Sequence, residues 1–159
     1  MTRLLSITTF GAALGCGLVA GVFFAFSTFV MPALARLPAA QGIAAMQSIN
    51  ITAINRWFMA ALLGTALLCL VLIALSLLYW SEPGALLRLL ASVLYLAGVI
   101  IVTRAFNIPL NDALAVASPE SADAANLWSR YLSVWTAWNH VRTVAPLGAA
   151  ALLTAALFR

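Results

Sequence analysis

The side chains with the most chemistry to offer lie in one short stretch, WTAWNHVRT, residues 135–143. It holds the only histidine of the chain, together with an asparagine, an arginine and two tryptophans: His140, Asn139, Arg142, Trp135 and Trp138. An imidazole can accept a proton, amide and guanidinium groups can stabilise a developing oxyanion, and indole rings can pack against a flat ligand. These five residues are therefore candidates for a catalytic or binding site.

A second group of polar side chains lies in NIPLND, residues 107–112. Pro109 disfavours helical backbone at the residue before it, so we predict that the chain turns sharply here. Asn107 and Asn111 then either satisfy the backbone groups that the turn frees or hold a carbonyl or enolate oxygen. Asp112 is either an acid/base group or a solvated partner for Arg104.

Helix geometry divides the residues around the histidine between two faces. At about 100° per residue, one stripe of the last helix carries Trp128, Tyr131, Trp135, Trp138, Asn139 and Arg142. His140 points to a different side, together with Ser133, Thr136 and Thr143. An ideal helix therefore cannot bring His140 and Arg142 into one narrow pocket, unless Pro146 kinks it. The sequence leaves two roles for His140, a catalytic base or a structural hydrogen-bonding group. One histidine with scattered carboxylates is poor material for a metal site, so we expect no metal.

The composition points to a membrane as the environment of these residues. Of 159 residues, 65% are hydrophobic and only 8% are charged, whereas soluble domains carry roughly a quarter charged residues. A span of the hydrocarbon core needs about 20 apolar residues. We predict one all-α membrane domain over residues 1–159, a four-helix bundle with spans near 4–30, 57–80, 84–106 and 126–158. The last helix exceeds the hydrocarbon core, so its first half must stand outside the bilayer or lie along its surface.

Residues 39–55, AAQGIAAMQSINITAIN, separate the first two spans and mix apolar residues at near-helical spacing with polar ones. We predict a short amphipathic helix at the membrane interface. An even number of up-and-down spans places both chain ends and the turn SEPG, residues 81–84, on one face. The other face receives most polar residues, among them Ser27, Asn50, Arg56, Arg104, Asn107, Asn111, Asp112, Asn139, His140 and Arg142. We interpret this face as a site at the level of the membrane boundary. The alternative is longer solvated loops whose arginines reach lipid headgroups.

Three motifs, FFAFSTFVMPAL (residues 23–34), NIPLND and WTAWNHVRT, together resemble the anthrone oxygenase-like family of small four-span membrane proteins. The resemblance implies an enzyme that oxidises an anthrone, a tricyclic aromatic ketone, to the anthraquinone with O2 and with neither metal nor flavin. Removal of one benzylic proton gives an electron-rich phenolate that reacts with O2 directly. Such a site needs a base, oxyanion donors and a flat apolar slot.

The chain has residues for each role that this resemblance implies. The base would be His140 or Asp112. The oxyanion donors would come from Asn107, Asn111, Asn139, Arg104 or Arg142. The walls would be Trp57, Trp135, Trp138, Phe26 and Phe106, with Ser27 and Asn50 as further polar contacts.

A different class of function fits the same composition, namely a non-enzymatic membrane subunit that binds or transports a small hydrophobic molecule. The expected partners are the lipid bilayer, a planar lipophilic aromatic and O2. Nucleic acid is not expected, because the eight arginines behind the net charge of +4 are scattered.

Two small-xxx-small patterns, Gly11/Gly15 and Gly17/Gly21, predict a homo-oligomer through the first span. Arginine without lysine indicates a GC-rich bacterial genome, and hence the bacterial inner membrane.

Overall fold

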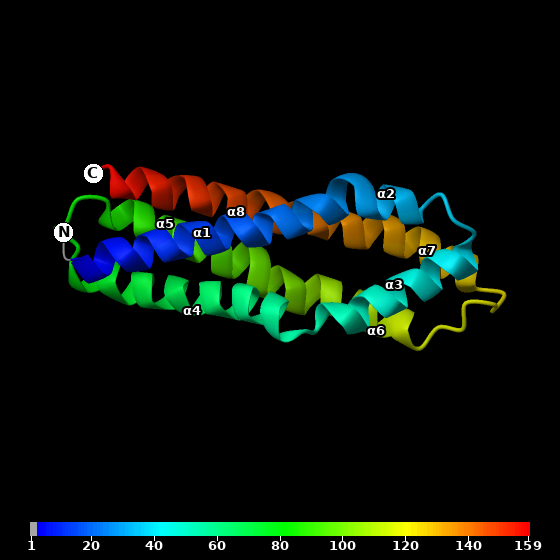
Figure 1. The fold of residues 1–159 in the computed structure, drawn as a ribbon. Coiled ribbons are helices and arrows are strands. Elements are labelled where there is room, and N and C mark those ends of the chain that lie inside the picture. Colours follow the sequence, from blue (N-terminus) through cyan, green and yellow to red (C-terminus); the bar gives the residue numbers. More distant parts are fainter. Residues whose placement is uncertain (1–2) are drawn as a thin grey trace.

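The computed structural model describes residues 3–159, and four long helical segments make up most of it (Figure 1). They run over Arg3–Leu34, Arg56–Leu78, Ala85–Ala115 and Ala124–Leu157, and each is long and apolar enough to cross a membrane. Residues 3–159 contain no strand. The predicted all-α, four-helix membrane bundle is therefore confirmed. We call the four segments columns one to four.

Three of the columns combine α-helix with π-helical turns, in which backbone bonds reach the fifth residue along. Column one consists of α1 (Arg3–Ala25), the π turn η1 (Phe26–Val30) and α2 (Met31–Leu34). Column two is α4 (Arg56–Leu78) alone. Column three consists of α5 (Ala85–Tyr95), η2 (Leu96–Ile101), η3 (Thr103–Asn107) and α6 (Ile108–Ala115). Column four consists of α7 (Ala124–Arg130), η4 (Tyr131–Trp135) and α8 (Thr136–Leu157).

The columns run antiparallel in an elongated bundle, as expected from an even number of spans. The start of α1, the end of α8 and the turn between α4 and α5 lie at one end (Figure 1). Gly84 closes that turn with a φ of 79°, a left-handed conformation that glycine adopts without a steric penalty. The polar residues of the two motifs lie toward the other half of the molecule.

Close helix packing holds the half of the bundle near the chain ends. Gly15 of α1 lies so close to Thr65 of α4 that a Cβ atom on the glycine would collide with the threonine side chain. Lipid offers no hydrophobic reason for helices to associate, so such close approaches supply van der Waals contact instead. Gly11 also faces α4, at Leu68, whereas a Cβ at Gly17 or Gly21 would meet no atom within 4 Å. Only the second glycine pair therefore stays open for the predicted oligomer.

The helix expected between the first two spans is α3 (Ala39–Ala53). Its buried residues are Gly42, Ile43 and Met46, and this face packs against α7 and α6. Figure 1 shows α3 extending the line of α4 toward the end of the bundle away from the chain ends. The break between them ends at Asn55, whose side-chain oxygen accepts 3.0 Å bonds from the Trp57 and Phe58 amides. This cap starts α4.

The predicted sharp turn at Pro109 is wrong, because the helix continues through it to Ala115. Ile108 has α-helical torsions of −59° and −49°, and its amide donates to the Thr103 carbonyl. The π turn η3 ends just before the proline. Pro109 therefore occupies the first turn of α6, where a missing N–H breaks no helical bond. Pro32 stands in the same position after η1, so it does not end column one either.

Candidate functional site

Arg142 is a buried cation in the bundle interior, with 5% of its surface exposed. Its Nη2 donates to Asn139 Oδ1 at 2.8 Å, and its Nη1 donates to Thr103 Oγ1 at 3.4 Å. The Nε–H has no hydrogen-bond partner. Within residues 3–159 no carboxylate forms an ion pair with this guanidinium. Since burying a charge without a counter-charge is costly, ionisable groups at such depth are functional candidates by default.

Two aromatic rings flank the guanidinium instead of a carboxylate. Its central carbon lies 4.4 Å from the ring centroid of Phe23 and 4.8 Å from that of Trp135. A cation–π contact contributes about 2 kcal/mol when the cation is desolvated. The two rings therefore offset part of the desolvation cost of Arg142, and they leave its Nε–H available to a ligand.

Asn139 fixes the position of the arginine and ties α8 to column one. Its Nδ2 donates to the Phe23 carbonyl and to Ser27 Oγ, both at 2.8 Å. Ser27 Oγ also lies 3.2 Å from Thr143 Oγ1, which donates to the Asn139 carbonyl at 2.9 Å. Both polar atoms of the Asn139 side-chain amide thus have hydrogen-bond partners, and these fix the orientation of the amide. We call these residues, with Arg142 and Thr103, the arginine cluster.

A second polar group lies where η4 faces α6 and α3. Asn111 Oδ1 accepts from the Tyr131 hydroxyl and from Trp135 Nε1, each at 2.8 Å. Asn107 is fully buried, and its Nδ2 donates to the Trp135 carbonyl at 3.2 Å. Asn50 of α3 is a polar neighbour of the Tyr131 side chain. We call these five residues the asparagine cluster, and Trp135 joins it to the arginine cluster.

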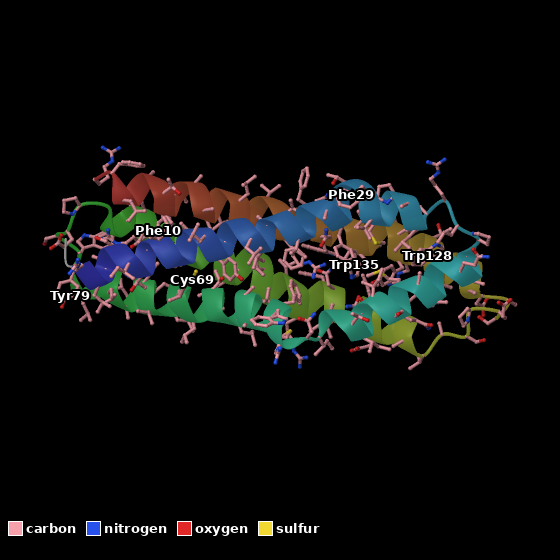
Figure 2. All side chains as sticks on the ribbon, in the orientation of Figure 1. Phe10, Phe29, Cys69, Tyr79, Trp128 and Trp135 are labelled. Atoms are coloured by element: carbon pink, nitrogen blue, oxygen red, sulfur yellow. The ribbon has the colours of Figure 1, made fainter. Side chains whose placement is uncertain are left out.

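A ladder of aromatic rings follows the inner face of column four. Trp128 and Tyr131 stack with centroids 5.7 Å apart, and Tyr131 and Trp135 with centroids 5.6 Å apart. Phe26 of η1 lies 6.0 Å from Trp135 in a tilted arrangement. Figure 2 labels Trp128 and Trp135 in the half of the bundle away from the chain ends. All three rings are buried, so the ladder forms closed apolar packing beside both polar clusters.

Five buried side-chain polar atoms without a hydrogen-bond partner among residues 3–159 lie in and around these clusters, and Ser76 Oγ lies elsewhere, in α4. The five are Arg142 Nε, Asn107 Oδ1, Asn50 Nδ2, Thr136 Oγ1 and Trp128 Nε1. Each buried group left without a partner costs about 1–3 kcal/mol. Native proteins keep few such atoms, and a group of them calls for an explanation such as a ligand or water.

The structure brings eight of the predicted site residues into the two clusters or against them. They are Arg142, Asn139, Ser27, Asn107, Asn111, Asn50, Trp135 and Phe26. Thr143 joins them, although helix geometry predicted that it shares the side of His140. Thr143 follows Asn139 by four residues within α8, about 40° away at about 100° per residue, so an ordinary α-helix already places these two on one face.

The remaining predicted residues lie outside the clusters. His140, Asp112 and Arg104 are exposed. Trp57 is 74% exposed at the start of α4. Phe106 and Trp138 stack on each other, with centroids 3.6 Å apart and planes 6° from parallel, so they form no open slot for a ligand.

Three residues in these contacts were missed by sequence reasoning: Phe23, Thr103 and Tyr131 in its polar role. Phe23 lies four residues before Ser27, so helical spacing places both on one face and could have indicated it. No comparable signal exists for Thr103, because a π turn begins there.

The profile of the anthrone oxygenase family matches residues 54–152, which is more than half of the chain. The chain belongs to the anthrone oxygenase family. The matched residues include five members of the two clusters, namely Thr103, Asn107, Asn111, Asn139 and Arg142. The other cluster residues Phe23, Ser27 and Asn50 precede the matched region. No curated protein and no solved structure matches the chain.

Proposed function

We propose that the protein oxidises a lipophilic polycyclic aromatic ketone of the anthrone type with O2, at the arginine cluster. The methylene carbon gains one oxygen atom and loses two hydrogens, and the second oxygen atom leaves as water. The observation that carries the proposal is Arg142, a buried cation without a carboxylate partner and with an unpaired Nε–H. Membership of the anthrone oxygenase family supports it.

Arg142 acts on the conjugate base of the substrate. Loss of a benzylic proton moves negative charge onto the ketone oxygen, and a preorganised donor in a water-poor site stabilises that charge. Asn139 holds the guanidinium in place through its 2.8 Å bond to Nη2. The electron-rich ring then reacts with O2 directly, so the proposal uses neither metal nor flavin.

The proton goes to water rather than to a side chain of the clusters. No carboxylate or imidazole belongs to either cluster, and His140 and Asp112 are exposed. The arginine therefore contributes by making the substrate more acidic. The tricyclic system packs against the Trp135 ring beside the guanidinium, where it has to displace a neighbouring ring because the ladder itself is closed.

The same absence of a carboxylate or imidazole from the clusters favours a second candidate function. A membrane subunit that only binds or carries a planar hydrophobic molecule needs no base. It would use the same aromatic ladder and would leave O2 unconsumed.

The test is oxygen stoichiometry with emodin anthrone as substrate and the purified protein in detergent. Oxygen uptake and anthraquinone absorbance are recorded together, in air and under nitrogen, with boiled protein as the measure of spontaneous oxidation. We expect protein-dependent anthraquinone formation with one O2 consumed per product. Binding of the anthrone with no acceleration over boiled protein would select the binding subunit.

A further inference from the structure

A groove of about 290 Å³ opens on the outside of the bundle between α1 and α4. Its walls are apolar and come from Leu18, Val19 and Val22 of α1 and from Phe58 and Ala61 of α4. Trp57 and Asn55 form its outer end. Pockets for small ligands begin at roughly this size, about 300 Å³.

The groove lies at the level where the bundle meets the membrane surface. Trp57 is largely exposed, and the Arg56 guanidinium lies 4.8 Å from its ring centroid. Tryptophan and arginine at the start of a span are typical of the interfacial belt. Both polar groups of the Asn55 amide are already bonded, to the Thr52 carbonyl and to two amides of α4. The groove therefore selects an occupant by shape and apolar contact.

Two aromatic rings connect the groove to the arginine cluster. Phe58, which forms one wall, meets Phe23 edge to face with centroids 6.2 Å apart and planes at 90°. Phe23 is 5% exposed, and its ring centroid lies 4.4 Å from the Arg142 guanidinium carbon. A single buried ring thus stands between the groove wall and the cation.

We propose that this groove is the lateral entrance by which a planar polycyclic aromatic leaves the bilayer and reaches Arg142, with Phe23 as its gate. This inference rests on the proposed function, which makes Arg142 the site that the ligand reaches. A flat ring system stacks on the Phe58 ring that lines the groove, whereas a flexible acyl chain gains no stacking there. When the Phe23 ring turns aside, the ligand replaces it against the guanidinium, and the unpaired Nε–H becomes the donor to the ligand oxygen.

Filling the groove tests this entrance. Ala61→Trp places a large side chain in the groove wall, and Ala60→Trp adds the same side chain at the neighbouring exposed position. Emodin, an air-stable anthraquinone, serves as the probe for association rates in stopped-flow fluorescence, and emodin anthrone serves as the substrate. We expect Ala61→Trp to lower the emodin association rate constant and the kcat/KM for emodin anthrone about tenfold, while Ala60→Trp leaves both unchanged. Val22→Phe narrows the opposite wall and replaces Ala61→Trp if that variant does not fold.

The outcomes separate this inference from the proposed function. If Ala61→Trp and Val22→Phe both take up emodin as fast as the unmodified protein, the groove is not the entrance, even if anthrone oxidation is intact. If either variant slows emodin uptake but neither the variants nor the parent oxidise the anthrone, the entrance is supported and the proposed oxygenase activity is wrong. If phospholipid bound to the purified protein is lost from Ala61→Trp while the emodin association rate is unchanged, the groove holds a lipid and the inference is overturned.

Discussion

At the residue scale, Arg142 is held by a set of small interactions rather than by one strong counter-charge. Two aromatic faces, one amide oxygen and one hydroxyl surround it. Removing Asn139 would release the guanidinium and leave the Phe23 carbonyl and Ser27 without their amide donor. Positioning of the cation therefore depends on an asparagine that need not touch the substrate.

Asn139→Ala should lower the stability of the protein by about 1–3 kcal/mol, because it leaves buried polar groups without partners. The measurement is thermal unfolding in detergent, followed by circular dichroism. Asn126→Ala provides the matched control, since Asn126 is exposed and its loss should leave the unfolding temperature unchanged. Equal unfolding temperatures for both variants would mean that Asn139 does not hold the cluster together.

At the element scale, π turns precede two of the three prolines within the columns, Pro32 and Pro109, whereas column four runs through Pro146 as ordinary α-helix. Three of the four columns contain them, and Pro32 and Pro109 each stand just after one. Apolar run length was enough to predict four spans, because a membrane helix needs its hydrophobic stretch in the sequence itself. No local pattern announces a π turn, so the continuation of column three past Pro109 could not be predicted.

The two glycine pairs of α1 differ in how closely they pack against α4. Gly15→Leu should destabilise the monomer by about 1–3 kcal/mol, because the added side chain collides with Thr65 in a filled interface. Gly17→Leu should leave the monomer as stable as before, since nothing lies within 4 Å of that position. Unfolding temperatures of the two variants in the same detergent compare them directly. A larger loss in Gly17→Leu would show that the outer glycine pair is covered by a second chain.

At the scale of the whole molecule, the bundle is longer than the hydrocarbon core is thick. Column four has 34 residues, which is about 51 Å of helix against about 30 Å of hydrocarbon. Arg56, Arg104 and His140 are exposed, and each lies about 25–33 Å along its column from the end that holds the chain termini. Arg142 lies about 22 Å from that end. We therefore expect the cation to lie inside the hydrocarbon layer, close to its boundary.

Placing the boundary at this level predicts how cysteines react at two exposed positions of α8. His140→Cys should react with a membrane-impermeant maleimide in reconstituted vesicles, whereas Val144→Cys, one turn deeper and also exposed on the bundle surface, should not. The native Cys16 and Cys69 are fully buried and should stay unlabelled. Equal labelling at both new positions would show that the membrane boundary does not lie near Arg142.

The composition of the site could be predicted better than its geometry. Arg142, Asn139 and Trp135 share one helix face, so spacing alone placed them together. The contacts of Ser27 and Thr103 with them cross between columns, and such contacts depend on how four helices pack. The same spacing predicted that His140 points away from Arg142, and the structure places it on the outside of the bundle.

The proposed oxidation depends on Arg142 rather than on His140. The most direct measurement compares kcat for emodin anthrone in Arg142→Gln and His140→Ala, after circular dichroism has shown both variants to be folded. Loss of one oxyanion donor lowers kcat by about 100-fold or more, so Arg142→Gln should fall by that amount while His140→Ala keeps the parent rate. A large loss in His140→Ala with Arg142→Gln unaffected would contradict the account and make the exposed histidine the base.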